Sequence, residues 1–204
     1  MSTRLEELAT EAAACTKCRL SAGRTQVVFA DGNPHADLMF IGEGPGYHED
    51  VQGLPFVGAA GQLLNRLLGE IGMRREDVRI TNVVLCRPPG NRDPLPDEIE
   101  ACKPYLLEHV DLVDPKVVCT LGNFASRVIL ERPVAISKIR GQRQAWRGRL
   151  VIPTFHPAAV LRGGGDASRV MQQVREDFAA LREALEEVRV AGGEPVTEEQ
   201  LGLF

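Results

Sequence analysis

The stretch Asp37-Leu38-Met39-Phe40-Ile41-Gly42-Glu43-Gly44-Pro45-Gly46 joins an apolar run to a turn made of glycine and proline around a single acid, Glu43. A short apolar run that ends at turn residues is typical of a buried strand. In a parallel sheet, the loop that follows such a strand lies at the carboxyl edge of the sheet, where ligands bind. We therefore expect Glu43 to face a ligand site.

The rest of the chain repeats this pattern of strand and helix. Apolar runs recur at residues 78–82, 117–121 and 150–153, while residues 61–71 and 96–113 carry apolar side chains at helical spacing. Alternating strands and helices predict an α/β fold in which helices flank a central, mainly parallel, four-stranded sheet. Because Asn82 ends one strand and His156 follows another, both are expected at the same edge as Glu43.

Length and composition are those of a globular chain. With 204 residues, 44% of them hydrophobic and 25% charged, we expect one domain over residues 1–190 and a flexible tail over residues 191–204. No apolar run approaches the ~20 residues that span a bilayer. The first residues also lack the order of a secretory signal. A cytoplasmic protein without membrane association is therefore expected, and monomer is the default.

The charge is unevenly distributed along the chain. The net charge is −4, yet residues 133–165 contain six basic residues and no acid. A basic segment within an acidic chain predicts a local basic surface.

Four of the five cysteines could share one metal centre: Cys15, Cys18, Cys86 and Cys102. The first two have the spacing of a metal-binding pair, and the wide separation of the other two is compatible with zinc or with an iron-sulfur cluster. A redox dithiol at Cys15 and Cys18, or free structural thiols, are the alternatives. The fifth, Cys119, lies within an apolar run and is expected in the core.

Several motifs occur in the order of one enzyme family. They are Gly42-Glu43-Gly44-Pro45-Gly46, Gly53-Leu54-Pro55-Phe56-Val57-Gly58, Thr81-Asn82, the four cysteines, and His156-Pro157-Ala158-Ala159-Val160-Leu161-Arg162. With these motifs the chain resembles a family 4 uracil-DNA glycosylase from about Cys15 to Arg162.

The resemblance implies a three-layer α/β/α sandwich with a [4Fe-4S] cluster on Cys15, Cys18, Cys86 and Cys102. It also implies an enzyme that flips uracil out of single- or double-stranded DNA and hydrolyses the N-glycosidic bond. The product would be the abasic site that initiates base excision repair.

Roles for individual residues follow from this chemistry. The amide of Asn82 offers one donor and one acceptor, which match the uracil 4-carbonyl and N3–H, and Phe56 is suited to stack on the flipped ring. His156 would donate a hydrogen bond to O2 of the departing uracil. Glu43 would stabilise the cationic sugar and position the attacking water. The expected substrate-binding residues are Gly42, Gly44, Gly46, Phe56, Asn82 and His156.

Two segments are expected to contact the DNA outside the base pocket. Leu161 would fill the gap left by the extruded nucleotide, with Arg162 on the flanking phosphate. Arg140, Gln142 and Arg143 lie in the basic segment and would contact the backbone. A solvent-exposed hairpin is the alternative for this second set.

Three other functions are compatible with part of the sequence. The cysteines alone would suit a cluster-dependent redox protein, but that does not explain Glu43, Asn82 and His156 at strand ends. A non-catalytic iron-sulfur DNA-binding protein would use the same fold. A related group traps the sugar covalently through a histidine-containing insert, and residues 87–94 of this chain contain no histidine.

Overall fold

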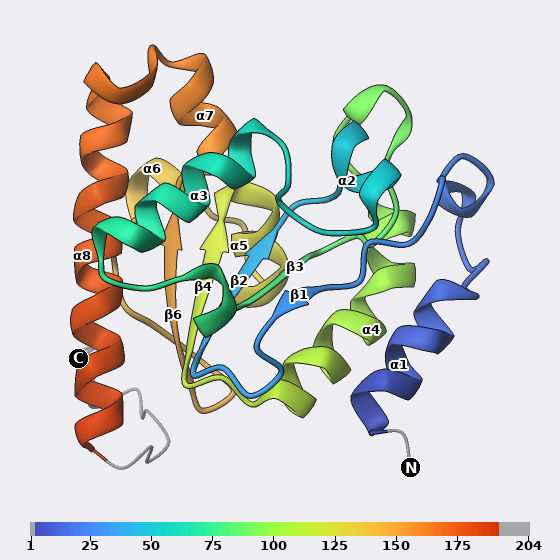
Figure 1. Ribbon diagram of the computed structural model, residues 1–204, viewed down its shortest axis with the longest axis horizontal. Helices are drawn as coiled ribbons and strands as arrows, with labels where there is room; N and C mark the ends of the chain where they lie inside the picture. The colour runs from blue at the N-terminus through green and yellow to red at the C-terminus, as the bar shows by residue number, and fades with distance from the viewer. Residues whose placement is uncertain (1–2, 192–204) are drawn as a thin grey trace.

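The computed structural model describes residues 3–191, so the predicted tail lies outside the described residues except for Ala191. A central sheet has the strand order β1-β3-β2-β4-β6-β5 (Figure 1). The strands are β1 (Asp31–Gly32), β2 (Leu38–Gly42), β3 (Arg79–Asn82), β4 (Val117–Leu121), β5 (Gln144–Trp146) and β6 (Arg149–Thr154).

The sheet has six strands, so the predicted number of four is wrong. Neighbours among β3, β2, β4 and β6 are parallel, and these four strands are the predicted ones. The two additional strands, β1 and β5, pair antiparallel at the two edges. They are two and three residues long and only partly buried at most positions. Such strands carry no apolar run that a sequence pattern could reveal.

Helices cover both faces of the sheet, which gives the three layers implied by the resemblance (Figure 1). Side chains alternate along each strand, so Phe40 and Ile80 pack with α3 and α8, whereas Met39 and Val118 pack with α1 and α4. The helices are α1 (Arg4–Ala13), α2 (Tyr47–Gln52), α3 (Ala59–Glu70), α4 (Pro96–Val113), α5 (Gly122–Leu130), α6 (Ile136–Ile139), α7 (Pro157–Arg162) and α8 (Arg169–Val190). No helix within residues 3–191 is long and apolar enough to span a bilayer.

The parallel strands direct the chain toward one edge. The arrowheads of β2, β4 and β6 point to the edge where α2 and α7 begin (Figure 1). The loops between β2 and α2 and between β6 and α7 therefore lie side by side at the carboxyl ends of the strands. This is the position at which parallel α/β sheets bind ligands.

Candidate active site

A cleft of about 550 Å³ opens at this edge of the sheet. Its volume is in the range of small-molecule sites, which is about 300–1,000 Å³. Its walls come from the loop after β2, the start of α2, the segment before α3, the loop after β3 and the start of α7. Of the residues predicted from sequence, Glu43, Gly44, Gly46, Phe56, Asn82, His156 and Arg162 line it.

Glu43 is held over the sheet end by backbone pairing. Its carbonyl accepts a hydrogen bond from Val84 N at 3.1 Å, which continues the pairing of β2 with β3. Burial, together with the nearby charge of Asp93, raises the pKa of the Glu43 carboxyl to about 7, although Arg162 opposes the shift. A carboxyl with this pKa exchanges protons near neutral pH, as a general base requires.

Asn82 presents an unpaired polar atom at the cleft. Its side chain is buried, and Oδ1 has no hydrogen-bond partner among the described residues. A buried acceptor without a partner costs about 1–3 kcal/mol, so a ligand that donates to it would gain that energy. Gly42 makes room for this arrangement, because a Cβ there would lie 2.4 Å from Asn82 Oδ1 and 2.6 Å from the Phe56 ring.

Phe56 is fixed in an unusual backbone conformation. Its φ is 53°, a value that ordinary side chains rarely adopt. Arg75 donates a hydrogen bond from Nη1 to the Phe56 carbonyl at 3.0 Å and ion-pairs with Asp31 at 2.6 Å. The packing of Gly61 of α3 against the same carbonyl leaves no space for a Cβ there. These contacts hold the aromatic ring at the cleft, and no sequence pattern predicted the role of Arg75.

Glu49 links two walls of the cleft. Its carboxylate accepts hydrogen bonds from Val57 N at 2.9 Å and Gly58 N at 2.8 Å, and from Gly46 N at 3.1 Å. One side chain thereby ties the loop after β2 to the segment that carries Phe56. Glu49 was not predicted, although its position three residues after Gly46 at a helix start is the spacing of a capping box.

His156 is neutral, and its hydrogen bond to the backbone shows which ring nitrogen carries the proton. Nδ1 accepts a hydrogen bond from Ala158 N at 3.2 Å and caps α7, so the proton must be on Nε2. Burial, together with the nearby charge of Arg162, lowers the pKa of the imidazole to about 4, although Glu49 opposes the shift. The ring lies 5.6 Å from that of Phe56. His156 thus supplies a neutral N–H donor to a cleft that contains an aromatic ring.

The residues predicted to contact DNA fall into two places. Arg162 lines the cleft, forms no ion pair with any described carboxylate, and follows Leu161, which is 44% exposed on α7. Arg140 and Arg143 instead bind acids of α8: Arg140 contacts Asp177 at 2.6 Å, and Arg143 contacts Glu187. Gln142 Nε2 donates to Lys138 O at 2.9 Å. The structure brings none of these three to the cleft.

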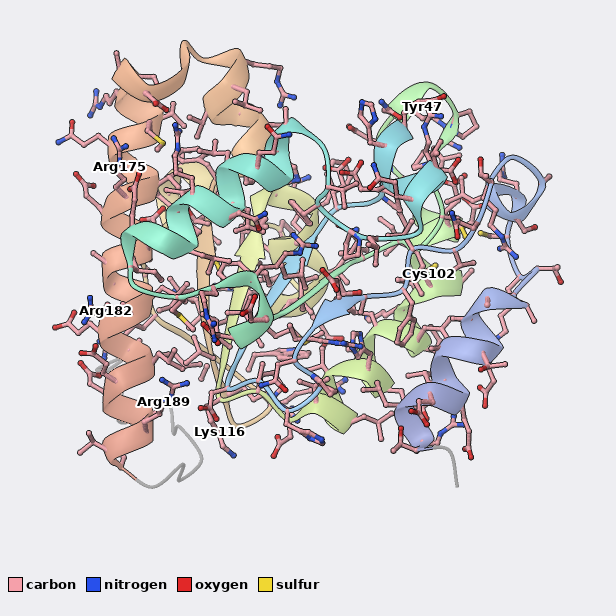
Figure 2. The ribbon with its side chains drawn as sticks, in the orientation of Figure 1. Tyr47, Cys102, Lys116, Arg175, Arg182 and Arg189 are labelled. Carbon is pink, nitrogen blue, oxygen red and sulfur yellow. The ribbon has the colours of Figure 1, made fainter. Side chains whose placement is uncertain are left out.

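A second, smaller cavity collects the four predicted cysteine ligands. It is lined by Cys15, Cys18, Cys86 and Cys102, all of them free thiols. Cys119 lies apart from it, buried within β4 as predicted. Figure 2 shows Cys102 on α4, on the side of the molecule that carries the N-terminal helix.

The surroundings of these thiols combine burial with two cations that line the cavity, Lys17 and Arg24, and Arg24 contacts the cysteine segments directly. Arg24 Nη1 donates to Cys86 Sγ at 3.3 Å and to Cys15 O at 2.7 Å. Burial raises the pKa of the Cys86 thiol, and it raises the pKa of Cys102 to about 12. Within residues 3–191, no three histidine, cysteine or acidic side chains form a site for one metal ion. The thiols thus share a cavity without surrounding a single ion.

Comparisons with known proteins agree with this architecture. The model of the uracil DNA glycosylase superfamily matches residues 29–185, which include the cleft residues described above. The class of protein is therefore a glycosylase-superfamily α/β domain with its site at the carboxyl ends of the strands.

Comparison with individual relatives identifies the family within this superfamily. A type-4 uracil-DNA glycosylase of Sulfurisphaera tokodaii is 44% identical over 88% of this chain and 84% of the relative. One of Thermotoga maritima is 48% identical over 76% of this chain and 82% of the relative. A type-5 uracil-DNA glycosylase of Pyrobaculum aerophilum is 33% identical over 62% of this chain and 63% of the relative. The chain belongs to the type-4 uracil-DNA glycosylase family, as its motifs predicted.

Proposed function

We propose that this protein is a monofunctional uracil-DNA glycosylase that hydrolyses the N-glycosidic bond of deoxyuridine in DNA and leaves an abasic site. The observation that carries the proposal is the buried, unpaired Oδ1 of Asn82 in a cleft shared with Phe56 and His156. An acceptor beside an aromatic ring suits a flat ligand with an edge N–H, and uracil N3–H is such a donor.

The first step breaks the bond between the sugar C1′ and uracil N1. Both bonding electrons leave with the base, so negative charge develops on uracil, chiefly at O2, and positive charge develops on the sugar. The Nε2–H of His156 donates to O2 as that charge forms. Because this donor is neutral and already fixed by Ala158, little reorganisation is needed at the moment of reaction.

The second step adds water to C1′. Ionised Glu43 stabilises the sugar cation and accepts the proton that water loses as its oxygen bonds to C1′. The uracil anion then departs and is protonated by solvent. Asn82 selects the base during both steps, since its amide pairs with uracil O4 and N3–H but cannot match the reversed pattern of cytosine in the same orientation.

The direct test is release of uracil from an oligonucleotide that contains one uracil, without added metal or reductant. We expect strand cleavage at the uracil after alkali treatment, none at a thymine control, and no protein-DNA adduct on a denaturing gel. A stable adduct would indicate covalent trapping of the sugar. No cleavage by intact protein would favour a binding protein on the same fold.

The pH dependence should report Glu43. The reactive form is the carboxylate, so the single-turnover rate should fall as pH decreases through the pKa of about 7. Arg162→Ala removes a positive charge that lowers this pKa, and should move the acid limb to higher pH. Asp93→Asn removes a negative charge that raises it, and should move the limb to lower pH. The measurement is the rate at saturating protein from pH 5 to pH 9, a range chosen around typical carboxyl and imidazole values.

The control for this pH series is Glu43→Gln, which should show a slow rate without an acid limb. Shifts of the two variants in the same direction would mean that another group governs the limb. His156 should contribute no limb near neutral pH, because its pKa of about 4 keeps it neutral there.

We also propose that the four thiols of the second cavity hold a [4Fe-4S] cluster. The support is the convergence of four thiols on one cavity, because a four-iron cluster is held by four cysteine thiolates. Iron would also deprotonate thiols whose pKa values burial has raised. Hydrolysis transfers no electrons, so the cluster would have a structural role. It would crosslink the segment after α1, the loop after β3 and α4.

Cys102→Ala should therefore lose most of the bound iron and sulfide and lower the midpoint of thermal unfolding. Cys119→Ala is the matched control, because it removes a buried thiol outside that cavity and should keep the iron content of the unmodified protein. Equal iron content in both variants would contradict the proposed ligand set.

Finally, we propose that the enzyme acts as a monomer in the cytoplasm as one domain over residues 1–190. The support for a single domain is that the described helices pack on the two faces of one sheet.

A further inference from the structure

A large aromatic side chain is exposed at the mouth of the cleft. Tyr47 is the first residue of α2, lines the cleft and is 57% exposed. Figure 2 shows it at the outer end of α2, on the side of the molecule opposite α8. Isolated exposed apolar residues are common, so exposure alone says little about its role.

The surroundings of Tyr47 are more specific. The Arg87 guanidinium lies over its ring, with the carbon Cζ 5.1 Å from the ring centroid, and the His48 ring packs edge-on at 5.5 Å. Asn91 Oδ1 holds Arg87 by accepting from Nε at 2.7 Å. Arg87 forms no ion pair with a carboxylate of residues 3–191, whereas Arg92, five positions later, binds Glu98 at 2.6 Å. The structure thus orders a cation beside an exposed ring without neutralising it.

The opposite wall carries a similar pair. Leu161 is exposed and Arg162 is free of ion pairs among the described residues, both at the end of α7. Residues of both α2 and α7 line the cleft, and Figure 1 shows these two helices apart from each other at the same end of the sheet. A strand with one nucleotide extruded into the cleft would place its neighbouring nucleotides toward these two walls.

We propose that Tyr47 and Arg87 form a stacking platform for the base that flanks the flipped uracil. This inference rests on the proposed function. An exposed aromatic face binds any base, and an unpaired guanidinium beside it can bind the adjacent phosphate while keeping the ring in place. The platform would act in single-stranded DNA above all, because an unpaired flanking base is free to leave its own stack.

The platform is tested by removing each partner of the stack in turn. The probe is a fluorescent single-stranded oligonucleotide with a tetrahydrofuran abasic site in place of the uracil nucleotide. Further probes lack the base on the 5′ side or on the 3′ side as well. Dissociation constants are measured by anisotropy for the unmodified protein, Tyr47→Ala, Tyr47→Phe, Arg87→Ala and Arg182→Ala.

We expect Tyr47→Ala to bind the probe with both flanking bases about tenfold more weakly, the size of one base-aromatic stack. Removing one flanking base from the probe should weaken its binding to the unmodified protein by a similar factor and leave its binding to Tyr47→Ala unchanged. Tyr47→Phe should keep the sensitivity to that base, and Arg87→Ala should reduce it. Arg182→Ala removes an exposed arginine on α8, far from the cleft, and should bind like the unmodified protein (Figure 2).

If Tyr47→Ala lost the same factor in affinity for every probe, relative to the unmodified protein, the platform would be overturned, because the tyrosine would then not contact a flanking base. Insensitivity of the unmodified protein to both flanking bases would also overturn it. Uracil release, assayed separately, distinguishes this failure from failure of the proposed function. If the protein releases uracil but its affinity shows no coupling between Tyr47 and a flanking base, only the platform is contradicted. If it releases no uracil, the proposed function itself is contradicted.

Discussion

Replacing His156 by alanine is expected to slow uracil release by about a hundredfold to a thousandfold. This is the range found when one preorganised donor to a developing oxyanion is removed. In this protein the Nε2–H is the donor, because Nδ1 is committed to Ala158 N. The loss should appear in the single-turnover rate at saturating protein, where DNA binding no longer limits the reaction.

His156 also caps α7, so a loss of activity could reflect disorder of that helix. His156→Ser separates the two roles, because serine is a good N-cap but cannot reach as far as an imidazole. The serine variant should recover the stability that alanine loses, about 1 kcal/mol in the free energy of unfolding, while activity stays low. Recovery of activity in His156→Ser would show that capping, and not donation to O2, is what the histidine contributes.

Asn82→Asp is expected to reduce uracil release by about a thousandfold or more and to create release of cytosine. The aspartate has nearly the same shape but loses the amide donor that matches uracil O4. A site built to pair with a polar edge rejects a mismatched one strongly, because buried groups are left unpaired. The ionised aspartate therefore has no donor for uracil O4. Its protonated form has one donor and one acceptor, which can match cytosine N3 and its amino group.

The measurement compares single-turnover release from matched oligonucleotides with uracil or cytosine at one position. Asn82→Ala is the control, since it removes both the donor and the acceptor and should release neither base well. If Asn82→Asp released uracil as fast as the unmodified protein, the amide donor of Asn82 would have no role in base selection.

The sequence predicted the parallel strands at whose ends the cleft lies. The strands at 38–42, 79–82, 117–121 and 149–154 were found within about one residue, and the helix at 96–113 with both of its ends. Each is long enough to show an apolar period and is bounded by turn or capping residues. The edge strands β1 and β5 were missed, because antiparallel pairs of two or three residues depend on the strand beside them.

The convergence of Glu43, Asn82 and His156 on one cleft was also predictable. Parallel strands in one sheet must end at the same edge, so residues at those ends meet whatever the details of packing. Their catalytic and binding roles stay predictions until the variants are measured. Arg75 was not predicted, because it donates to the carbonyl of Phe56, which lies nineteen positions away in the sequence.

The basic segment shows the limit of reasoning from local charge. Residues 133–165 contain no acid, yet Arg140, Arg143 and Arg149 all form ion pairs with acids from other parts of the chain. The acids come from α8 and from the end of α4 with the turn after it. Only the packing of those elements decides which arginines remain free to bind phosphate.

The sequence by itself thus determined the α/β class, two of the helices, the parallel strands, and the three polar residues at the strand ends. These follow from local periodicity and from the rule that parallel strands share an edge. The tertiary structure decided the tautomer of His156, the unpaired state of Asn82, the tie made by Glu49, and which cations stay unpaired. Each of these depends on contacts between residues that are brought together only when the layers pack, and no local pattern encodes them.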